Sequence, residues 1–200
     1  MPTRTGITRQ ALLEATAELI YQRGITATGV DLIAERAGVT KRTLYQHFRS
    51  KDDLVAASLS ERGEVALELF GRAAASRARR TGQPAVLALF DVIERLLAGP
   101  MPAGCALLNA SLELADPDHP ARRAAREKLT ARNELVARLL REAGVDDAEL
   151  AGELALLVDG AFATGGAHRD PSAAARAKRA AAHLIDRYRA TAPRTPRAPS

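Results

Sequence analysis

Apolar residues recur at helical spacing along almost the whole chain, and this periodicity predicts an all-α fold. We find no convincing alternating strand pattern and no internal repeat. Aromatic residues make up only 4% of the sequence and tryptophan is absent, so the core must consist mainly of Leu, Ala, Val and Ile. This composition suits close-packed helices better than sheets. The 200 residues suffice for one large domain or for two small ones that share a core.

Capping residues and glycine or proline breaks divide the chain into about nine predicted helices. The first ends at Gly24, the second begins after Thr28 and ends at Gly38, and the third and fourth are capped by Thr40 and Ser50. Thr28 and Ser50 each precede an aspartate by three residues, as in a capping box. The fourth helix runs toward residue 77, and later helices are expected near 84–98, 104–115, 119–143, 146–164 and 171–190.

These helices predict a three-helix head in residues 1–50, which the long fourth helix joins to a helical body in residues 51–190. The Pro-rich basic tail, residues 191–200, is predicted to be disordered. Residues 1–50 carry seven Arg or Lys and four acidic residues, and residues 169–200 carry eight against two. Because the net charge is only +5, the middle of the chain is acidic. Basic ends on an acidic body indicate at least one surface that faces a polyanion.

Localisation signals and membrane spans are not expected. The first ten residues are polar and lack the apolar stretch of a signal peptide. Cys105 is the only cysteine, so the chain forms no internal disulfide, which fits a reducing cytoplasm. The most apolar later stretch, residues 154–167, is glycine-rich and interrupted by Asp159, so we expect it to be too short and too broken to span a bilayer.

The segment from Thr28 to Phe48 is the most informative part of the sequence. Its two short helices are joined by Ala37-Gly38-Val39, and glycine allows the positive φ that such a tight turn needs. A helix, a short glycine turn and a second helix form the layout of DNA-binding helix-turn-helix units. In those units the second helix enters the major groove and its N-terminal residues reach base edges.

The outer face of that second helix carries groups suited to DNA. At about 100° per residue, Leu44 and Phe48 point together into the core. The residues directed away from them are Lys41, Arg42, Thr43, Tyr45 and Gln46. Planar donors, a small hydroxyl and a ring are what base edges and phosphates require, although a merely solvated helix face has the same composition.

A dense motif in this region resembles a known family. It consists of Ile33-Ala34-Glu35-Arg36-Ala37-Gly38-Val39-Thr40, followed by Thr43-Leu44-Tyr45, His47-Phe48 and Ser50-Lys51. With these residues, positions 7–59, about a quarter of the chain, resemble the DNA-binding domain of the TetR family of bacterial repressors. The resemblance implies that the helix from Thr40 to Phe48 is the recognition helix.

The resemblance also implies a set of DNA-contacting positions. Base or nearby phosphate contacts fall at Thr40, Lys41, Arg42, Thr43, Tyr45 and Gln46, and further phosphate contacts at Thr28, His47 and Lys51. Lys51 begins the fourth helix, where the helix dipole favours an anion. Two positions depart from the family pattern: Arg42 stands where many members have a small residue, and Gly29 where Ser or Thr is frequent.

The resemblance implies that the body binds a small molecule and forms a homodimer through the last two helices. One of these helices has an apolar face of Leu150, Leu154, Leu157 and Ala161, and the other of Ala177, Ala181, Leu184, Ile185 and Tyr188. Alanine-rich faces allow the close approach of a four-helix interface, but plain intrachain core is the alternative. A palindromic operator needs two heads, which favours the dimer.

A small-molecule site is expected around residues 104–120, which begin with Gly-Cys and resemble a C-terminal domain common in the family. Polar Asn109, Ser111 and Glu113 interrupt a mostly apolar helix, either as fixed points for a largely apolar effector or as satisfied core or surface residues. The candidate binding residues are Phe90, Leu108, Asn109, Leu112 and Phe162. Apolar residues such as the four named here are more often simply part of the core.

Redox sensing, metal binding and catalysis are not expected. Cys105 fits an inert small hydrophobe better than a redox sensor. Asp116, Asp118 and His119 are possible metal ligands, but their Pro-rich setting indicates a helix end followed by an N-cap, so no metal or cofactor is predicted. Catalytic motifs are absent from the sequence. We therefore expect a homodimeric repressor that a small molecule releases from a palindromic operator; a non-sequence-specific DNA-coating protein is the alternative.

Overall fold

The computed structural model describes residues 4–99 and 104–191, and within these ranges the chain is all-helical, with nine helices and no strand. The helices are α1 (Arg4–Arg23), α2 (Val30–Arg36), α3 (Lys41–His47), α4 (Lys51–Thr81), α5 (Ala85–Leu97), α6 (Ala106–Glu113), α7 (Pro120–Glu142), α8 (Ala148–His168) and α9 (Ser172–Thr191). The predicted fold class is therefore confirmed. The predicted basic tail falls almost entirely in residues 192–200, outside the described part of the chain.

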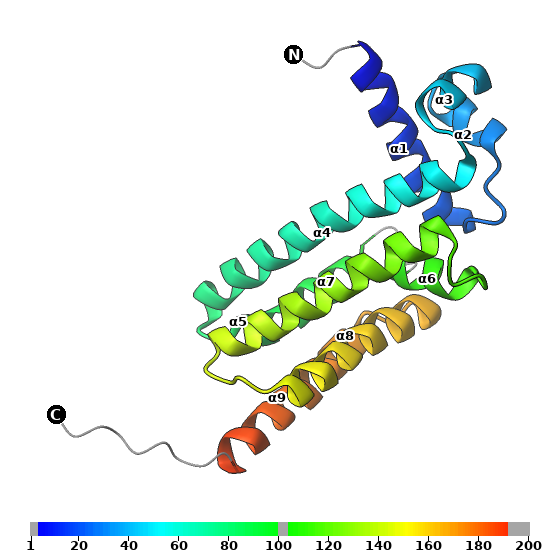
Figure 1. Cartoon of the computed structure of the whole chain (residues 1–200). Coiled ribbons are helices and arrows are strands. Elements are labelled where there is room, and N and C mark those ends of the chain that lie inside the picture. The colour runs from blue at the N-terminus through cyan, green and yellow to red at the C-terminus, as the bar shows by residue number, and fades with distance from the viewer. Residues whose placement is uncertain (1–3, 100–103, 192–200) are drawn as a thin grey trace.

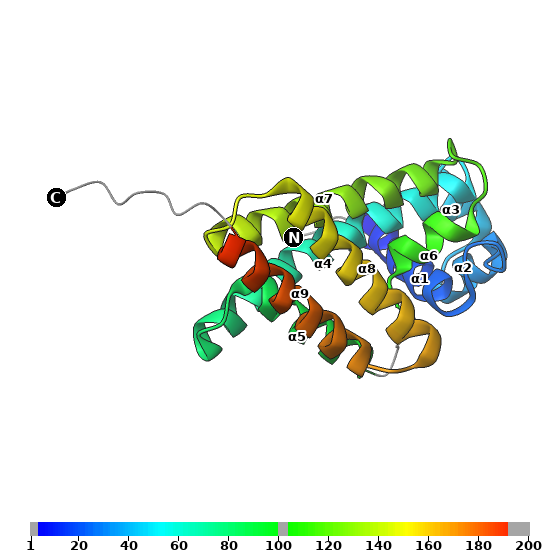
Figure 2. The ribbon, with the colours of Figure 1, turned by 90° about the horizontal axis from the view of Figure 1, so that it is seen from below.

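The long helix α4 connects the two parts of the molecule. Helices α1, α2 and α3 gather at one end of α4, and α4 then runs beside α7 and α5 along the body (Figure 1). Seen from below, α8 and α9 lie side by side in front of the rest of the body (Figure 2). The Ser50 hydroxyl accepts a hydrogen bond from the Asp53 N–H, which confirms Ser50 as the cap of α4.

Helix boundaries differ from the prediction at several places, and two of these differences have a clear structural cause. The N-cap of α2 is Gly29, because Thr28 is fully buried and its hydroxyl donates to the Gly24 carbonyl at 2.7 Å. Helix α8 continues through Gly165 to His168, where a chain break was predicted. A Cβ at position 165 would lie 2.4 Å from Leu97 Cδ1, so this glycine allows close helix packing instead of ending the helix.

Three apolar clusters hold the chain together. The head core combines Leu12 and Leu19 of α1 with Ile33, Leu44 and Leu54. The body core is larger and joins α4, α5, α7, α8 and α9. The third cluster lies between them and consists of Ile20, Ile25, Val55, Leu59, Ala110, Ala121 and Ala125. Because its members come from α1, α4, α6 and α7, the head is packed against the body and is not merely tethered to it.

A nearly buried carboxylate fastens three body helices. Asp91 of α5 accepts hydrogen bonds from Lys178 of α9 and Gln83, both at 2.7 Å, and from Arg77 of α4 at 3.2 Å. Burial raises the pKa of Asp91, but these three hydrogen bonds outweigh burial and hold the pKa below its usual value. Asp91 is therefore ionised at neutral pH and joins α5 to both α4 and α9.

Candidate DNA-binding surface and head–body junction

The helix-turn-helix unit has the predicted geometry. Gly38 takes a φ of 67° in the turn, a conformation that L side chains rarely adopt. The Thr40 hydroxyl then caps α3 by accepting a hydrogen bond from the Thr43 N–H at 3.1 Å. Leu44 is fully buried and Phe48 nearly so, which confirms the predicted inner side of the recognition helix.

The outer side of α3 is available to a partner. Arg42, Tyr45 and Gln46 are all exposed, and Tyr45 retains 48% of its surface although it is a large ring. Among the described residues, none of these three side chains takes part in a hydrogen bond or ion pair that would have to break first. A ring, a guanidinium and an amide thus lie together on one exposed face, as base-edge recognition requires.

Three further predicted contacts, Thr40, Lys41 and Thr43, already have partners within the head. The Lys41 ammonium lies 3.0 Å from the Asp31 carboxylate of α2, and the Thr40 and Thr43 hydroxyls are 2.8 Å apart. Both Lys41 and Asp31 are at least half exposed, so their pair is weak and a phosphate would compete with it. His47, also predicted to contact phosphate, is half-buried at the end of α3.

Thr28 and Lys51 have structural partners that were not predicted. The Thr28 side chain has no exposed surface, so in this conformation it does not reach a DNA phosphate. The Lys51 ammonium donates to the Ile25 carbonyl at 2.7 Å, which holds the turn between α1 and α2 against the start of α4. The sequence could have predicted the partner of Thr28. A threonine four residues after Gly24, which ends the first helix, can donate a hydrogen bond from its hydroxyl to the Gly24 carbonyl.

The five predicted effector-binding residues do not converge on one pocket. Phe90 is buried in the body core, and Phe162 packs there against Phe70 with ring centroids 6.1 Å apart. Leu108 is half-buried, whereas Leu112 is 76% exposed and faces solvent, because it lies on the side of α6 opposite the packed Ala110. Asn109 lines a different site, a cavity of about 70 Å³ between α6 and α1.

A buried cation in the body was missed by the sequence interpretation. Arg132 of α7 is 3% exposed, forms an ion pair with Asp159 of α8, and places its guanidinium 5.9 Å from the centre of the Phe162 ring. Its Nη1 atom lies 3.7 Å from the Cys105 sulfur, and its Nε–H finds no partner in the described chain. Helical spacing from Ala125 and Lys128 would have placed Arg132 on the inner side of α7.

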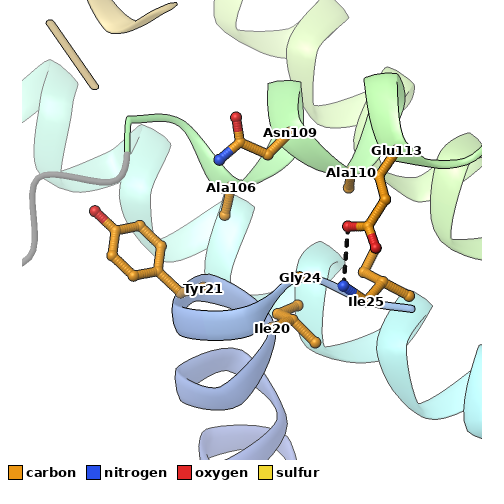
Figure 3. A pocket seen from close by; sticks show the side chains of 8 residues that line it. All are labelled: Ile20, Tyr21, Gly24, Ile25, Ala106, Asn109, Ala110 and Glu113. Carbon is orange, nitrogen blue, oxygen red and sulfur yellow. Dashed lines mark hydrogen bonds between the residues drawn. The ribbon is translucent and has the colours of Figure 1, made fainter. Parts of the chain in front are cut away.

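The head and body meet at Glu113, the last residue of α6. Its carboxylate accepts a hydrogen bond from the backbone N–H of Ile25 at 2.9 Å (Figure 3). It also accepts one from the backbone N–H of Thr26 at 2.7 Å. Burial raises the pKa of Glu113, but the two backbone hydrogen bonds and the nearby Lys51 charge outweigh it and lower the pKa overall. Glu113, considered as an effector contact, thus binds the head instead.

The predicted dimer faces of α8 and α9 belong to the intrachain core. The buried members are Leu150, Leu154 and Ala161 on α8 and Ala177, Ala181 and Ile185 on α9, while Leu157, Leu184 and Tyr188 are partly buried against them. On the outer side of α8, Leu156 is 72% exposed, and a Cβ at Gly152 or Gly160 would meet no atom within 4 Å. Periodicity located the apolar faces but not what covers them.

Two expectations from the sequence, no metal site and no membrane span, can be compared with the described residues. Within residues 4–99 and 104–191 no group of three His, Cys, Asp or Glu side chains could hold a metal ion. His119 is the N-cap of α7, as the Pro-rich pattern predicted. Contrary to the prediction, α8 is long and apolar enough to cross a membrane by length and composition alone. Its apolar side, however, packs into the body core.

Two family models match the chain. Residues 12–58 match the bacterial regulatory proteins of the tetR family, and residues 82–181, half of the chain, match the tetracyclin repressor-like C-terminal domain. The chain belongs to the TetR family. The first match covers the helix-turn-helix unit and the second covers most of the body from α5 to α9.

Individual relatives agree with this assignment. This chain is 41% identical over 88 residues to the transcriptional activator FasR of Mycolicibacterium smegmatis. It is 40% identical over 65 residues to the regulator AcrR of Shigella flexneri. These alignments cover 43% and 30% of this chain, and only 40% and 30% of the relatives.

Solved structures extend the likeness to almost the whole chain. A TetR regulator of Streptomyces avermitilis is 33% identical with a TM-score of 0.76, covering 90% of this chain and 97% of that one. One from Streptomyces coelicolor is 28% identical with a TM-score of 0.77, covering 90% and 95%. This TetR chain is therefore a sequence-specific DNA-binding transcriptional regulator and not an enzyme.

Proposed function

We propose that this TetR-family protein is a homodimeric cytoplasmic repressor that a largely apolar small molecule releases from a palindromic operator. The observation that carries the proposal is the exposed set of Arg42, Tyr45 and Gln46 on a helix whose other side is buried in the head. These three side chains have no hydrogen-bond or ion-pair partner in the part of the chain that the structure describes. A patterned face of this kind favours sequence reading over the alternative of non-specific DNA coating. FasR is an activator, so the direction of regulation needs its own measurement.

A second copy of the chain would cover the outer side of α8. Gly152, Leu156 and Gly160 follow one another at intervals of four residues and therefore form one row on that helix. The glycines leave room on either side of an exposed leucine, so a partner helix can approach closely. A two-fold interface at this row would give the assembly two heads, as a palindrome requires.

The effector would enter the body near Phe162 and Arg132. The surroundings are mainly apolar side chains of the body core, which fits a largely apolar molecule. One hydrogen-bond acceptor on that molecule would meet the Arg132 Nε–H, which is buried and lacks a partner among the described residues. Buried donors without partners are costly, so such an acceptor would contribute both affinity and orientation.

Selection of bound sequences from a random DNA pool tests the proposal. We expect a palindrome whose half-site centres are about 34–36 Å apart, or a multiple of that spacing. Binding to this sequence should exceed binding to random DNA by roughly 10³ or more. Equal binding to all sequences would instead identify a DNA-coating protein. A reporter behind the selected operator then separates repression from activation.

Single substitutions on α3 should change sequence preference. Arg42→Ala and Gln46→Ala are each expected to cost roughly 1–3 kcal/mol of operator binding if their side chains read bases, and to relax preference at particular base pairs. Binding of each variant to every single-base operator variant, measured by fluorescence anisotropy, checks this expectation. Arg79→Ala, at the exposed far end of α4, removes one charge away from the head and is the matched control.

Salt dependence separates reading from phosphate contact. If Arg42→Ala lowers the salt slope by about one unit and leaves base preference unchanged, Arg42 contacts only a phosphate. Lys51→Ala would not test phosphate contact alone, because the Lys51 ammonium also donates to the Ile25 carbonyl.

A further inference from the structure

Two side chains occupy the centre of the outer face of α3. Leu44 is fully buried, so it fixes which side of α3 faces the head core. At about 100° per residue, Arg42 lies about 160° from Leu44 in one direction around the helix, and Gln46 about 160° in the other. Both side chains are exposed, and they lie about one turn, or 6 Å, apart along the helix axis. Arg42 and Gln46 therefore point away from the head core.

The remaining polar side chains of α3 lie at the edges of this face. Lys41 and Tyr45 are on one flank, and Thr43 and His47 are on the other, at about 60–100° from Leu44. When a recognition helix lies in the major groove, its flanks face the sugar-phosphate walls and the centre of its outer face meets the base edges. The geometry thus directs the two central side chains to bases.

The guanidinium of Arg42 keeps its donors available. Other cations of the head are paired with carboxylates, and these pairs are Arg9–Glu61, Arg36–Glu18, Lys41–Asp31 and Arg49–Asp53. Within residues 4–99 and 104–191, Arg42 takes part in no such pair. Its planar fork can donate two parallel hydrogen bonds to O6 and N7 of a guanine, which is the commonest specific contact in the major groove.

The amide of Gln46 has a different complement. It presents a donor and an acceptor side by side, which match the N7 acceptor and the N6 donor of adenine. Because bases stack at about 3.4 Å, the axial separation of about 6 Å between Arg42 and Gln46 corresponds to one or two base steps.

We infer that Arg42 reads a guanine and that Gln46 reads an adenine about one or two base pairs away in each half-site. The inference deepens the function proposed above and rests on it for the presence of half-sites. It names the base that each central residue selects. A phosphate contact by Arg42 is the alternative that the test must separate.

Exchanging the amide for a carboxylate tests the inference through a change of preference. Glutamate only accepts hydrogen bonds, so in Gln46→Glu it should select the N4 amine of cytosine in place of adenine. We expect wild type to prefer adenine at this position by about tenfold or more, and Gln46→Glu to prefer cytosine there while it keeps the guanine. Fluorescence anisotropy with all four base pairs at each position measures both preferences. A reversed preference cannot result from partial unfolding.

Arg42 is tested by two substitutions. Arg42→Lys should retain the guanine preference, because lysine also donates to O6 and N7. Arg42→Ala should lose that preference, by about tenfold or more, and retain the adenine preference. Gln22→Glu, exposed near the end of α1, adds the same charge to the head as Gln46→Glu and is the control. It should leave both base preferences unchanged.

The outcomes separate this inference from the proposed function. A Gln46→Glu protein that still prefers adenine would overturn the inference, and so would an Arg42→Ala protein that keeps its guanine preference. A palindrome selected by the wild type without a guanine and an adenine at this spacing would also overturn it, and would leave the proposed function standing. A selected non-palindromic site that contains both bases would contradict the proposed dimer and support the reading by α3. Equal binding to all sequences would overturn both.

Discussion

Replacing Leu156 by aspartate should split the proposed dimer and weaken binding to the full operator by about a hundredfold or more. Leu156 is 72% exposed in the single chain, so the change leaves the body core intact. In the proposed interface, the aspartate would face its own copy across the two-fold axis, which combines a buried charge with like-charge repulsion. Sedimentation or light scattering should then give the mass of one chain.

Leu96→Asp is the matched control for this prediction. Leu96 lies on α5, is 50% exposed, and belongs to neither α8 nor α9. The control should remain dimeric and keep its operator affinity. A Leu156→Asp protein that still has the mass of two chains would show that the row of Gly152, Leu156 and Gly160 is not the interface.

Phe90→Ala should lower the free energy of unfolding by about 3–5 kcal/mol, the usual cost of emptying a phenylalanine site in a core. Phe90 is 1% exposed and is surrounded by α4, α7, α8 and α9 side chains of the body core. Urea unfolding followed by circular dichroism measures the loss. The head core is separate, so half-site binding should persist at temperatures where the variant remains folded.

Leu112→Ala is the comparison for Phe90→Ala, because both residues were predicted to line the effector site and only Phe90 is buried. Leu112 is mostly exposed, so its removal should change stability by no more than about 0.5 kcal/mol. A Phe90→Ala protein as stable as the wild type would indicate that Phe90 borders a cavity able to collapse or already open to solvent.

The sequence predicted the head well because local rules determine it. Gly38 requires a left-handed turn, Thr40 and Ser50 cap the helices that follow them, and Leu44 and Phe48 share one side of α3 by spacing alone. The same rules placed Arg42 and Gln46 outside. Thr28 was misplaced because its hydroxyl has two local choices, the following helix or the preceding carbonyl, and burial selected the carbonyl.

The body was less predictable because its contacts join residues far apart in sequence. Helical periodicity shows that Leu154 and Ala181 lie on apolar faces. It does not show whether these faces pack within one chain, as they do here, or against a second copy of the chain. The hydrogen bond from the Ile25 N–H to the Glu113 carboxylate joins residues that are 88 positions apart in the sequence. No local sequence pattern predicts such a partner. Arg132 was overlooked because a charged residue on an inner helix face is read as surface until its neighbours are known.

The three partners of Asp91 also bear on how the protein is made. Lys178 lies on α9, which the ribosome completes after the other eight described helices, whereas the head helices emerge first. Before α9 has been synthesised, it cannot pack against α5, and Asp91 lacks the hydrogen bond from the Lys178 ammonium. Domains tend to fold in the order of their synthesis, so a nascent chain has a finished head before it has a closed body. In the dimer proposed above, the two heads would therefore be paired only after α9 has packed against α5.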